Sequence, residues 1–480
     1  MTTGSDSTPR RRILVVGGGV SGLVAARELA SSFDVIIAEA ADTTGGKIRT
    51  VEFRGRPLDV GPDVFITRNP EAEQLCRQLG LDDELVAPSS SSAAVWARGS
   101  MRPLPKGLAV GIPTDLTALW RSTVVSPRDV VRAATDLIPR RPVTPPSFGR
   151  AAKGGADASI ADIVRPRLGG AVFDTLVAPL LGGINAGRAE ELSFEATAPE
   201  LARAVAGKWR LMPALRRFAS GSGRTPARPI FLGLEPGLAT LVQSLEQDCS
   251  SRGVKLERAA PVARLRRLDD DRWRALVAGR EQEFGGVLLA VSAGEAARLL
   301  DDEAPELAGQ LSAIPYAGVV TVTFAWPRSA LPSGGNGRLV GSGALVPRGT
   351  TLTTALTFVS TKWPRSANPG ELVIRSSAGR YGDERALESD DGELVRRIRE
   401  EIRVFLGIKE PPLDVHVERF PASFPQYVVG HLRRVDRIEQ LADELGGIAL
   451  TGSWTHGVGI PSCIGEAKRA AAKLAAEPAR

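Results

Sequence analysis

The clearest alternation of apolar and polar positions lies near the start of the chain. Residues 12–17 (RILVVG) and 34–40 (DVIIAEA) are short apolar runs, and residues 21–32 between them have the mixed pattern of an amphipathic helix. Buried parallel strands have such continuous apolar runs, whereas a helix that covers a sheet is apolar on one face only. The pattern predicts a strand–helix–strand unit and an α/β fold.

A different pattern later in the chain predicts a second sheet. Residues 318–326 alternate strictly, which is typical of an antiparallel strand with one face on a core. A further strand is expected over 285–292, and helices over 238–250 and 393–407, the last ending at Gly407. The predicted inward face of the alternating strand consists of Val320, Val322, Phe324 and Trp326, and that of the last helix of Leu394, Ile398, Ile402 and Phe405.

Residues 71–218 are mainly helical in pattern, with a loop rich in proline and glycine over 139–159. At 480 residues and 43% hydrophobic content, the whole chain is long enough to bury a large core. The net charge of +6 favours an anionic ligand, although codon usage alone would also enrich arginine. Since no basic run is interleaved with aromatic residues, we do not expect binding to nucleic acid.

Cysteine and histidine usage narrows the chemistry. Cys76, Cys249 and Cys463 lie far apart, which predicts neither a disulfide framework nor a zinc site and suits a reducing cytoplasm. Three histidines are few for a metal site or a catalytic triad, so no metal is predicted. No apolar stretch approaches the roughly 18 residues of a membrane span, so we expect no transmembrane segment.

The first predicted turn carries a nucleotide-binding pattern. Gly17, Gly19 and Gly22 form G-x-G-x-x-G between a strand and a helix, which allows backbone to approach a pyrophosphate at the helix N-terminus. Glu39 follows Gly17 by 22 residues and could accept hydrogen bonds from ribose hydroxyls. The pattern predicts an adenine dinucleotide but leaves FAD and NAD open.

The far end of the chain favours FAD. Residues 446–474 read as a strand, a glycine-rich turn and a helix, with Gly457 and Gly459 in the turn and Pro461 in the first helical turn. A helix N-terminus directed at a flavin would stabilise the negative charge of its reduced form. We therefore expect two glycine-rich turns, at opposite ends of the chain, to hold one cofactor.

Several segments together resemble the bacterial coproporphyrinogen and protoporphyrinogen oxidases of the amine oxidase superfamily. They are residues 43–50 (TTGGKIRT), 58–65 (LDVGPDVF), 104–115, 178–193, 424–431 and 457–464 (GVGIPSCI). The chain departs from the family pattern at Asp59, usually glutamate, and at Ser462, usually aspartate. We expect Ser462 to cap the last helix about as well as aspartate.

The resemblance implies a set of FAD contacts. Lys47 would meet the pyrophosphate, the backbone of Val262 would meet adenine, and Phe420 would lie near the flavin at a position where the family often has tryptophan. The remaining implied contacts are Gly17, Gly18, Gly19, Val20, Ser21, Gly22, Glu39 and Ala40 for the adenosine and pyrophosphate, and Gly61, Pro62, Asp63, Val64, Val458, Gly459 and Ile460 for the isoalloxazine.

The resemblance also implies the domain organisation. A Rossmann-like FAD-binding domain would comprise residues 1–70, 225–300 and 430–480. Residues 71–218 would form a helical insertion, and residues 301–429 a substrate-binding domain with an antiparallel sheet.

The implied activity is oxidation of coproporphyrinogen III to coproporphyrin III in haem biosynthesis. Six electrons would leave in three flavin cycles, with dioxygen as oxidant and hydrogen peroxide as product, and a ferrochelatase would be a partner. No catalytic base is assigned. The alternatives are a protoporphyrinogen IX oxidase, another flavin amine oxidase or desaturase, and a non-catalytic flavoprotein that binds porphyrin. Arg68, Arg188 and Arg380 are candidates for the substrate carboxylates or are solvated surface charges.

Overall fold

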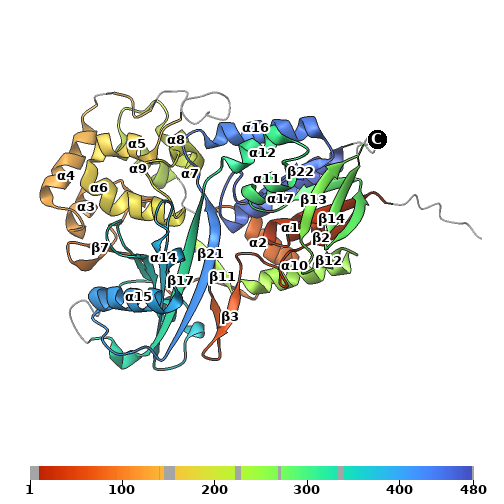
Figure 1. The fold of residues 1–480 in the computed structure, drawn as a ribbon. Helices are drawn as coiled ribbons and strands as arrows, with labels where there is room; N and C mark the ends of the chain where they lie inside the picture. The colour runs from red at the N-terminus through yellow and green to blue at the C-terminus, as the bar shows by residue number, and fades with distance from the viewer. Residues whose placement is uncertain are drawn as a thin grey trace, which may run out of the picture.

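A five-stranded parallel sheet holds the two ends of the chain together (Figure 1). The computed structural model describes residues 10–139, 141–144, 157–221, 229–268, 272–332 and 339–477. The predicted strand–helix–strand unit is confirmed, with α1 (Val20–Leu29) between the first two strands. The sheet has the order β12 (Lys255–Glu257), β2 (Asp34–Ala38), β1 (Arg12–Val16), β16 (Gly286–Leu289), β22 (Ile448–Leu450).

Helices cover both faces of this sheet. Ile13 and Val15 of β1 face one core, and Leu14 and Val16 face another, because successive side chains of a strand point to opposite faces. The first core is covered by α1, α2 (Glu71–Gln78), α10 (Ala239–Ser251) and α17 (Ile460–Ala476). The second is covered by α11 (Ala293–Leu300), α12 (Pro305–Ser312), α16 (His431–Leu445) and an antiparallel sheet of β13 (Val262–Arg267), β14 (Trp273–Val277) and β15 (Arg280–Phe284).

A seven-stranded sheet forms the second large sheet of the molecule, in the lower part of Figure 1. It is antiparallel except where β18 pairs with β7. The predicted inward face of β17 is fully buried and packs against α15 (Asp391–Leu406), whose C-cap Gly407 is left-handed with φ of 77°. The order is β21 (Asp414–Pro425), β17 (Tyr316–Pro327), β20 (Glu371–Ala378), β19 (Thr353–Thr357), β18 (Gly343–Leu345), β7 (Ala94–Ala97), β8 (Ser100–Pro103).

The remaining helices gather at the upper left of Figure 1 around one apolar core. Ser126 and Ser159 each begin a helix with a capping box. These helices are α3 (Leu116–Ser122), α4 (Pro127–Ala134), η1 (Thr135–Leu137), α5 (Ile160–Leu168), α6 (Gly170–Val172), the π-helix η3 (Phe173–Gly182), α7 (Phe194–Thr197), α8 (Pro199–Val205) and α9 (Leu211–Gly221). The loop expected over 139–159 lies largely outside the described residues.

Short elements connect these parts. They are β3 (Thr50–Phe53), β4 (Arg56–Asp59), β5 (Phe65–Ile66), β6 (Leu85–Val86), β9 (Leu108–Ala109), β10 (Ile112–Pro113), β11 (Phe231–Leu234), η4 (Arg328–Ala330), α13 (Val359–Lys362), η6 (Pro364–Ser366) and α14 (Arg385–Glu388). Within the described ranges, no helix combines the length and the apolar character that a membrane span requires.

Candidate cofactor site

The turn between β1 and α1 requires its glycines. Gly17 has φ of 102°, and its N–H donates to the Ala38 carbonyl at 2.9 Å. A Cβ on Gly22 would lie 1.8 Å from the Gly17 carbonyl oxygen, so no larger residue fits there. A Cβ on Gly19, in contrast, would meet nothing within 4 Å. The turn is therefore tight on its inner side and open beside Gly19.

The N-terminus of α1 is available to an anion. Its N-cap is Gly19, no side chain caps it, and its first turn, which begins with Val20 and Ser21, has no acidic residue. The first N–H groups of a helix have no partner within the helix, and they carry the positive end of its dipole. These two properties fit a pyrophosphate.

Glu39 lies at the carboxyl end of β2, as predicted, against the same turn. Its carboxylate accepts hydrogen bonds from the N–H of Gly18 at 2.6 Å and of Ala41 at 2.8 Å. Ala40 between them is exposed. The carboxylate is thus fixed beside the turn, where it could accept hydrogen bonds from a ribose.

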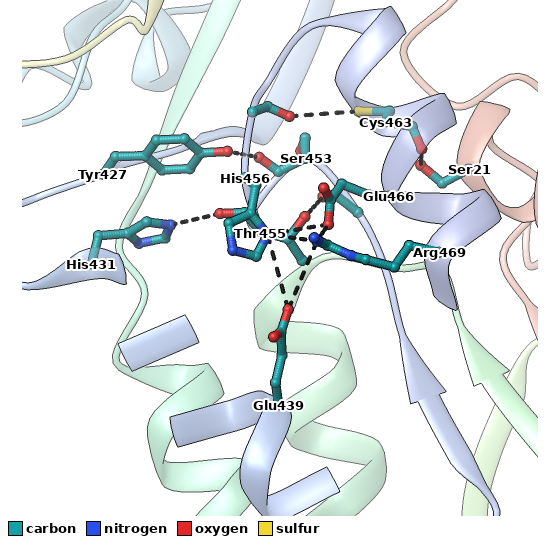
Figure 2. Close-up of polar contacts among 12 residues, drawn as sticks. Ser21, Tyr427, His431, Glu439, Ser453, Thr455, His456, Cys463, Glu466 and Arg469 are labelled. Atoms are coloured by element: carbon teal, nitrogen blue, oxygen red, sulfur yellow. Dashed lines mark hydrogen bonds and ion pairs between the residues drawn. The ribbon is translucent and has the colours of Figure 1, made fainter. Parts of the chain in front are cut away.

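The last helix, α17, begins next to α1. The Ser21 hydroxyl donates to the Cys463 carbonyl at 3.5 Å, so the first turns of the two helices meet (Figure 2). The N-cap of α17 is the exposed Gly459, and its first turn also lacks an acidic residue and a side-chain cap. Val458 packs against the helical core and Ile460 is buried. The two glycine-rich turns therefore converge.

The expectation that Ser462 caps α17 is wrong. The helix begins at Ile460, so Ser462 is its third residue, and the N-cap is Gly459. The side chain of Ser462 lies against Gly457, where an added Cβ would be 2.5 Å from the Ser462 Oγ. Gly457 is therefore required for this contact.

Tyr427 and His431 contact the turn before α17 from one side, at the left of Figure 2. The Tyr427 hydroxyl donates to the Ser453 carbonyl at 2.5 Å, and the His431 Nε2 lies 3.2 Å from the Thr455 carbonyl. The two rings are stacked with centroids 4.1 Å apart, and both are buried. Burial lowers the pKa of His431 to about 4, so a neutral ring donates to Thr455 at neutral pH.

On the outer side of the turn, His456 joins a surface network. Its Nδ1 lies 3.2 Å from Glu466 and 2.8 Å from Arg469, and Arg469 also binds Glu466 (Figure 2). Glu439 on α16 lies 3.9 Å from both His456 and Arg469. This network ties α16 to α17 across the turn.

We expect the contribution of His431 to stability to depend on pH. The unfolded chain, with a histidine pKa of 6.5, binds more protons than the folded chain between pH 6.5 and about 4, so the contribution is complete above pH 6.5 and is lost as pH falls. The difference in thermal midpoint between the unsubstituted protein and His431→Gln should therefore shrink from pH 7 to pH 5. His416→Gln, on the seven-stranded sheet, is the control. If His431→Gln lowers the thermal midpoint by the same amount at pH 7 and at pH 5, the expectation is wrong.

Residues 61–64 lie between the two sheets. A Cβ on Gly61 would lie 2.0 Å from the Lys47 carbonyl and 3.6 Å from the Phe420 ring, so Phe420 lies beside this segment, and its contact with a flavin stays a prediction. Arg375 of β20 donates to the Gly61 carbonyl at 3.1 Å. Asp63 is buried, whereas Gly61, Pro62 and Val64 are half-buried.

Sequence reasoning missed the partners of Asp63. Its carboxylate accepts from Lys362 at 2.8 Å and from the Trp363 indole at 3.0 Å, and it lies 3.6 Å from Arg375. Although burial opposes the charge, Arg375 and Lys362 together lower the pKa of Asp63 to about 2. Asp63 in an otherwise apolar segment indicates that a cationic partner is needed, but no neighbouring residue in the sequence indicates which cation provides it.

Lys47 faces inward. Its ammonium donates to the Ser423 carbonyl of β21, and burial lowers its pKa. The expected contact with pyrophosphate stays a prediction, as does the adenine contact of Val262, whose carbonyl accepts a hydrogen bond from Arg298 at 2.9 Å.

The structure supplies a role for Asp59, which the sequence left open. Its carboxylate accepts from the Thr50 hydroxyl at 2.5 Å and from the Leu238 N–H at 3.0 Å, at the start of α10. Burial raises its pKa to about 6. Arg68, in contrast, forms an exposed ion pair with Glu200 at 2.7 Å.

The arrangement fits FAD. The fixed carboxylate of Glu39 suits the ribose. The uncapped N-terminus of α1, with the open space beside Gly19, suits the pyrophosphate, and the uncapped N-terminus of α17 suits a second anionic region of the same extended dinucleotide. Glu39, residues 17–22, 61–64 and 458–460 would hold it.

Comparisons with known proteins agree with this fit. The model of the family described as flavin containing amine oxidoreductase matches residues 20–475. The chain is 29% identical to coproporphyrinogen III oxidase of Bacillus subtilis (97% of this chain, 98% of the relative), and 32% identical to that of Mycobacterium bovis (96% and 97%). The crystal structure of a protein assigned as a protoporphyrinogen oxidase from Exiguobacterium sp. 255-15 has a TM-score of 0.84 and 28% identity, covering 97% of this chain and 98% of that one. The chain therefore belongs to the flavin containing amine oxidoreductase family, and it is an FAD-dependent oxidoreductase.

Proposed function

We propose that the protein oxidises coproporphyrinogen III to coproporphyrin III in haem biosynthesis. The observation that carries this proposal is similarity along nearly the whole chain to relatives named coproporphyrinogen III oxidase. A porphyrinogen loses six electrons when it becomes an aromatic porphyrin. Glu39 and residues 17–22, 61–64 and 458–460 would hold the FAD that accepts these electrons in three two-electron steps, with three molecules of dioxygen as the final oxidant and three of hydrogen peroxide as product.

We assign three domains to this activity. The parallel sheet and most of its helices would form a Rossmann-like FAD-binding domain from residues 1–70, 225–300 and 430–480, and α2 and α12 pack on the same sheet from outside these ranges. Residues 301–429 form the substrate-binding domain around the seven-stranded sheet, to which residues 71–218 contribute β7 and β8 besides the helical insertion. The substrate would meet the cofactor where these parts join, near Gly61 and Phe420.

The residues of the chain act mainly by positioning. Arg375 and Asp63 fix the segment 61–64, and Tyr427 and His431 fix the turn before α17. The N-terminus of α17 offers its N–H groups to negative charge that develops during the reaction. Holding the substrate in one orientation is a large part of catalysis when the oxidised product is aromatic and no strong base is needed.

Two further assignments accompany the activity. We propose a cytoplasmic location, which suits the free, buried state of Cys76, Cys249 and Cys463. A ferrochelatase would be the partner that takes the product. Protoporphyrinogen IX is the second candidate substrate, favoured by the solved structure from Exiguobacterium.

The decisive experiment compares the two porphyrinogens. Both are prepared without oxygen, mixed in air with the purified protein, and followed by porphyrin fluorescence. We expect a yellow protein that produces coproporphyrin faster than protoporphyrin. A colourless protein that takes up no FAD, or a yellow one that oxidises amines and neither porphyrinogen, would overturn the proposal.

A further inference from the structure

Three arginines surround the turn that follows β20. Arg380 lies within this turn, where it forms an isolated bridge with Asp383. Arg188 donates to the Gly382 carbonyl at 3.5 Å, and Arg348 donates to the Tyr381 carbonyl at 3.4 Å. Residues far apart in the sequence are thus brought to one turn, which we call the arginine turn (residues 379–383).

The arginine turn is fixed to the helical part of the molecule. The Tyr381 N–H donates to the Ala186 carbonyl at 2.7 Å, two residues before Arg188. A Cβ on Gly382 would lie 2.5 Å from the Arg188 guanidinium, so the glycine permits that side chain to lie across the turn. The backbone of the arginine turn is therefore fixed, and Arg188 lies across it.

Within the described residues, these guanidinium groups use only part of their hydrogen-bonding capacity. The Nε atoms of Arg188 and Arg380 are buried and have no hydrogen-bond partner among the described residues. Among the carboxylates of the described residues, only that of Glu191 forms an ion pair with one of these three arginines. It lies 3.2 Å from Arg188. The two carbonyl contacts are long and therefore weak. Buried donors without acceptors are costly and rare in folded proteins.

The other acidic groups near the turn have other partners. Asp383 forms two contacts of 2.7 Å with Arg385, Glu190 binds Arg165 at 2.9 Å, and Glu401 accepts from the N–H groups of Leu352 and Thr353 at 2.7 and 2.9 Å. These carboxylates are therefore engaged with other groups, and none of them forms an ion pair with Arg348 or Arg380. Burial and the neighbouring Arg348 lower the pKa of Arg380 to about 10, and burial and Arg188 lower that of Arg348.

The arginine turn lies near the candidate flavin site. Gly379 touches Val319 of β17, where an added Cβ would be 3.3 Å from its Cα, and Phe420 pairs with Val319 from the other side. Two strand spacings, ~10 Å, therefore separate the start of the turn from Phe420. A tetrapyrrole is wide enough to bridge this separation.

We propose that Arg188, Arg348 and Arg380 form a binding site for a carboxylate. The proposal rests on the proposed function, under which the ligand is a carboxylate side chain of the porphyrinogen. The planar guanidinium forks suit carboxylates, and the bound anion would supply the acceptors that the buried N–H groups lack. The site would favour a tetracarboxylate over a substrate with fewer carboxylates.

Binding of product tests this site without turnover. Coproporphyrin III is titrated into the FAD-loaded protein and its fluorescence followed, with its tetramethyl ester as the uncharged probe. We expect Arg348→Gln and Arg380→Gln each to weaken coproporphyrin binding about tenfold and to leave ester binding unchanged. The coproporphyrin affinity of Arg348→Lys should lie between those of the unsubstituted protein and Arg348→Gln. The matched control is Arg403→Gln, which removes an exposed arginine on α15 that pairs with Glu400 and should leave the affinity unchanged.

Thermal stability separates a binding role from a structural one. Removing one of several repelling charges should leave the unfolding midpoint unchanged or raise it, whereas removal of a structural arginine would lower it. In Arg348→Gln and Arg380→Gln, the KM for coproporphyrinogen should rise about tenfold, whereas the flavin content and kcat should not change. Unchanged coproporphyrin affinity in both glutamine variants, or equal loss of acid and ester binding with a lower midpoint, would overturn the proposal.

The outcomes also separate this proposal from the proposed function. If the protein binds coproporphyrin through these arginines and oxidises neither porphyrinogen, the function fails and the carboxylate site stands. If turnover is intact and the variants keep the original KM and affinity, the site fails and the function stands.

Discussion

Gly22→Ala is expected to abolish tight FAD binding. The added Cβ would lie 1.8 Å from the Gly17 carbonyl, a backbone atom in a turn that also pairs with Ala38. Either α1 moves away from β1 or the turn opens, and both changes displace the N–H groups at the helix start. We expect the affinity for FAD to fall by at least about tenfold, measured by the ratio of flavin to protein absorbance and by flavin titration.

A matched glycine separates this effect from helix propensity. Gly294 also lies in the first turn of a helix, α11, is exposed, and has nothing within 4 Å of an added Cβ. Gly294→Ala should keep full flavin content and lose no stability, because alanine favours a helix over glycine by up to about 1 kcal/mol. A yellow Gly22→Ala protein with unchanged affinity would show that the close contact at the turn does not control binding.

Asp63→Asn is expected to destabilise the junction between the two sheets. The substitution keeps the shape of the side chain but leaves the buried Arg375 and the half-buried Lys362 without their counter-charge. Breaking a buried ion pair from one side costs about 3–5 kcal/mol. We expect a clearly lower thermal midpoint together with weaker flavin binding, because Arg375 also holds the Gly61 carbonyl.

An exposed ion pair provides the control. Glu400 and Arg403 pair on the solvent face of α15, where screening by water leaves little net stabilisation, so Glu400→Gln should not change the midpoint. If Asp63→Asn unfolds at the same temperature as Glu400→Gln, the buried cluster does not hold the junction.

The parts of the fold that follow from local pattern were predictable. The strands around α1 are short apolar runs, and α15 ends at Gly407, which adopts the left-handed conformation that glycine favours. The expectation that α1 is apolar on one face only is wrong, because residues 21–26 are all buried between the sheet, α10 and α17. The alternation from Val320 to Trp326 predicted which face of β17 packs against α15, because a strand repeats every two residues. The expectation that only one face lies on a core is wrong, since residues 320–326 are all buried and Ala325 belongs to a second core. In each case neighbouring residues carry the whole signal.

Contacts between distant segments were not predictable. β7 and β8 join the seven-stranded sheet from a region with a helical pattern, because strand pairing depends on partners hundreds of residues away. Nothing local joins Asp63 to Arg375, or His431 to Thr455. The predicted cap at Ser462 is three residues too late, because helix ends are the least certain part of a prediction from sequence and the N-cap of α17 is Gly459.

The pairing of β16 with β1 on one side and with β22 on the other bears on how the protein is made. Until residues 448–476 have been synthesised, the side of α1 that packs against α17 has no covering helix. Ile464 and Leu474 cover that side only after they emerge. We therefore expect flavin uptake to follow the docking of α17, because the second helix N-terminus of the proposed FAD site is not in place before then.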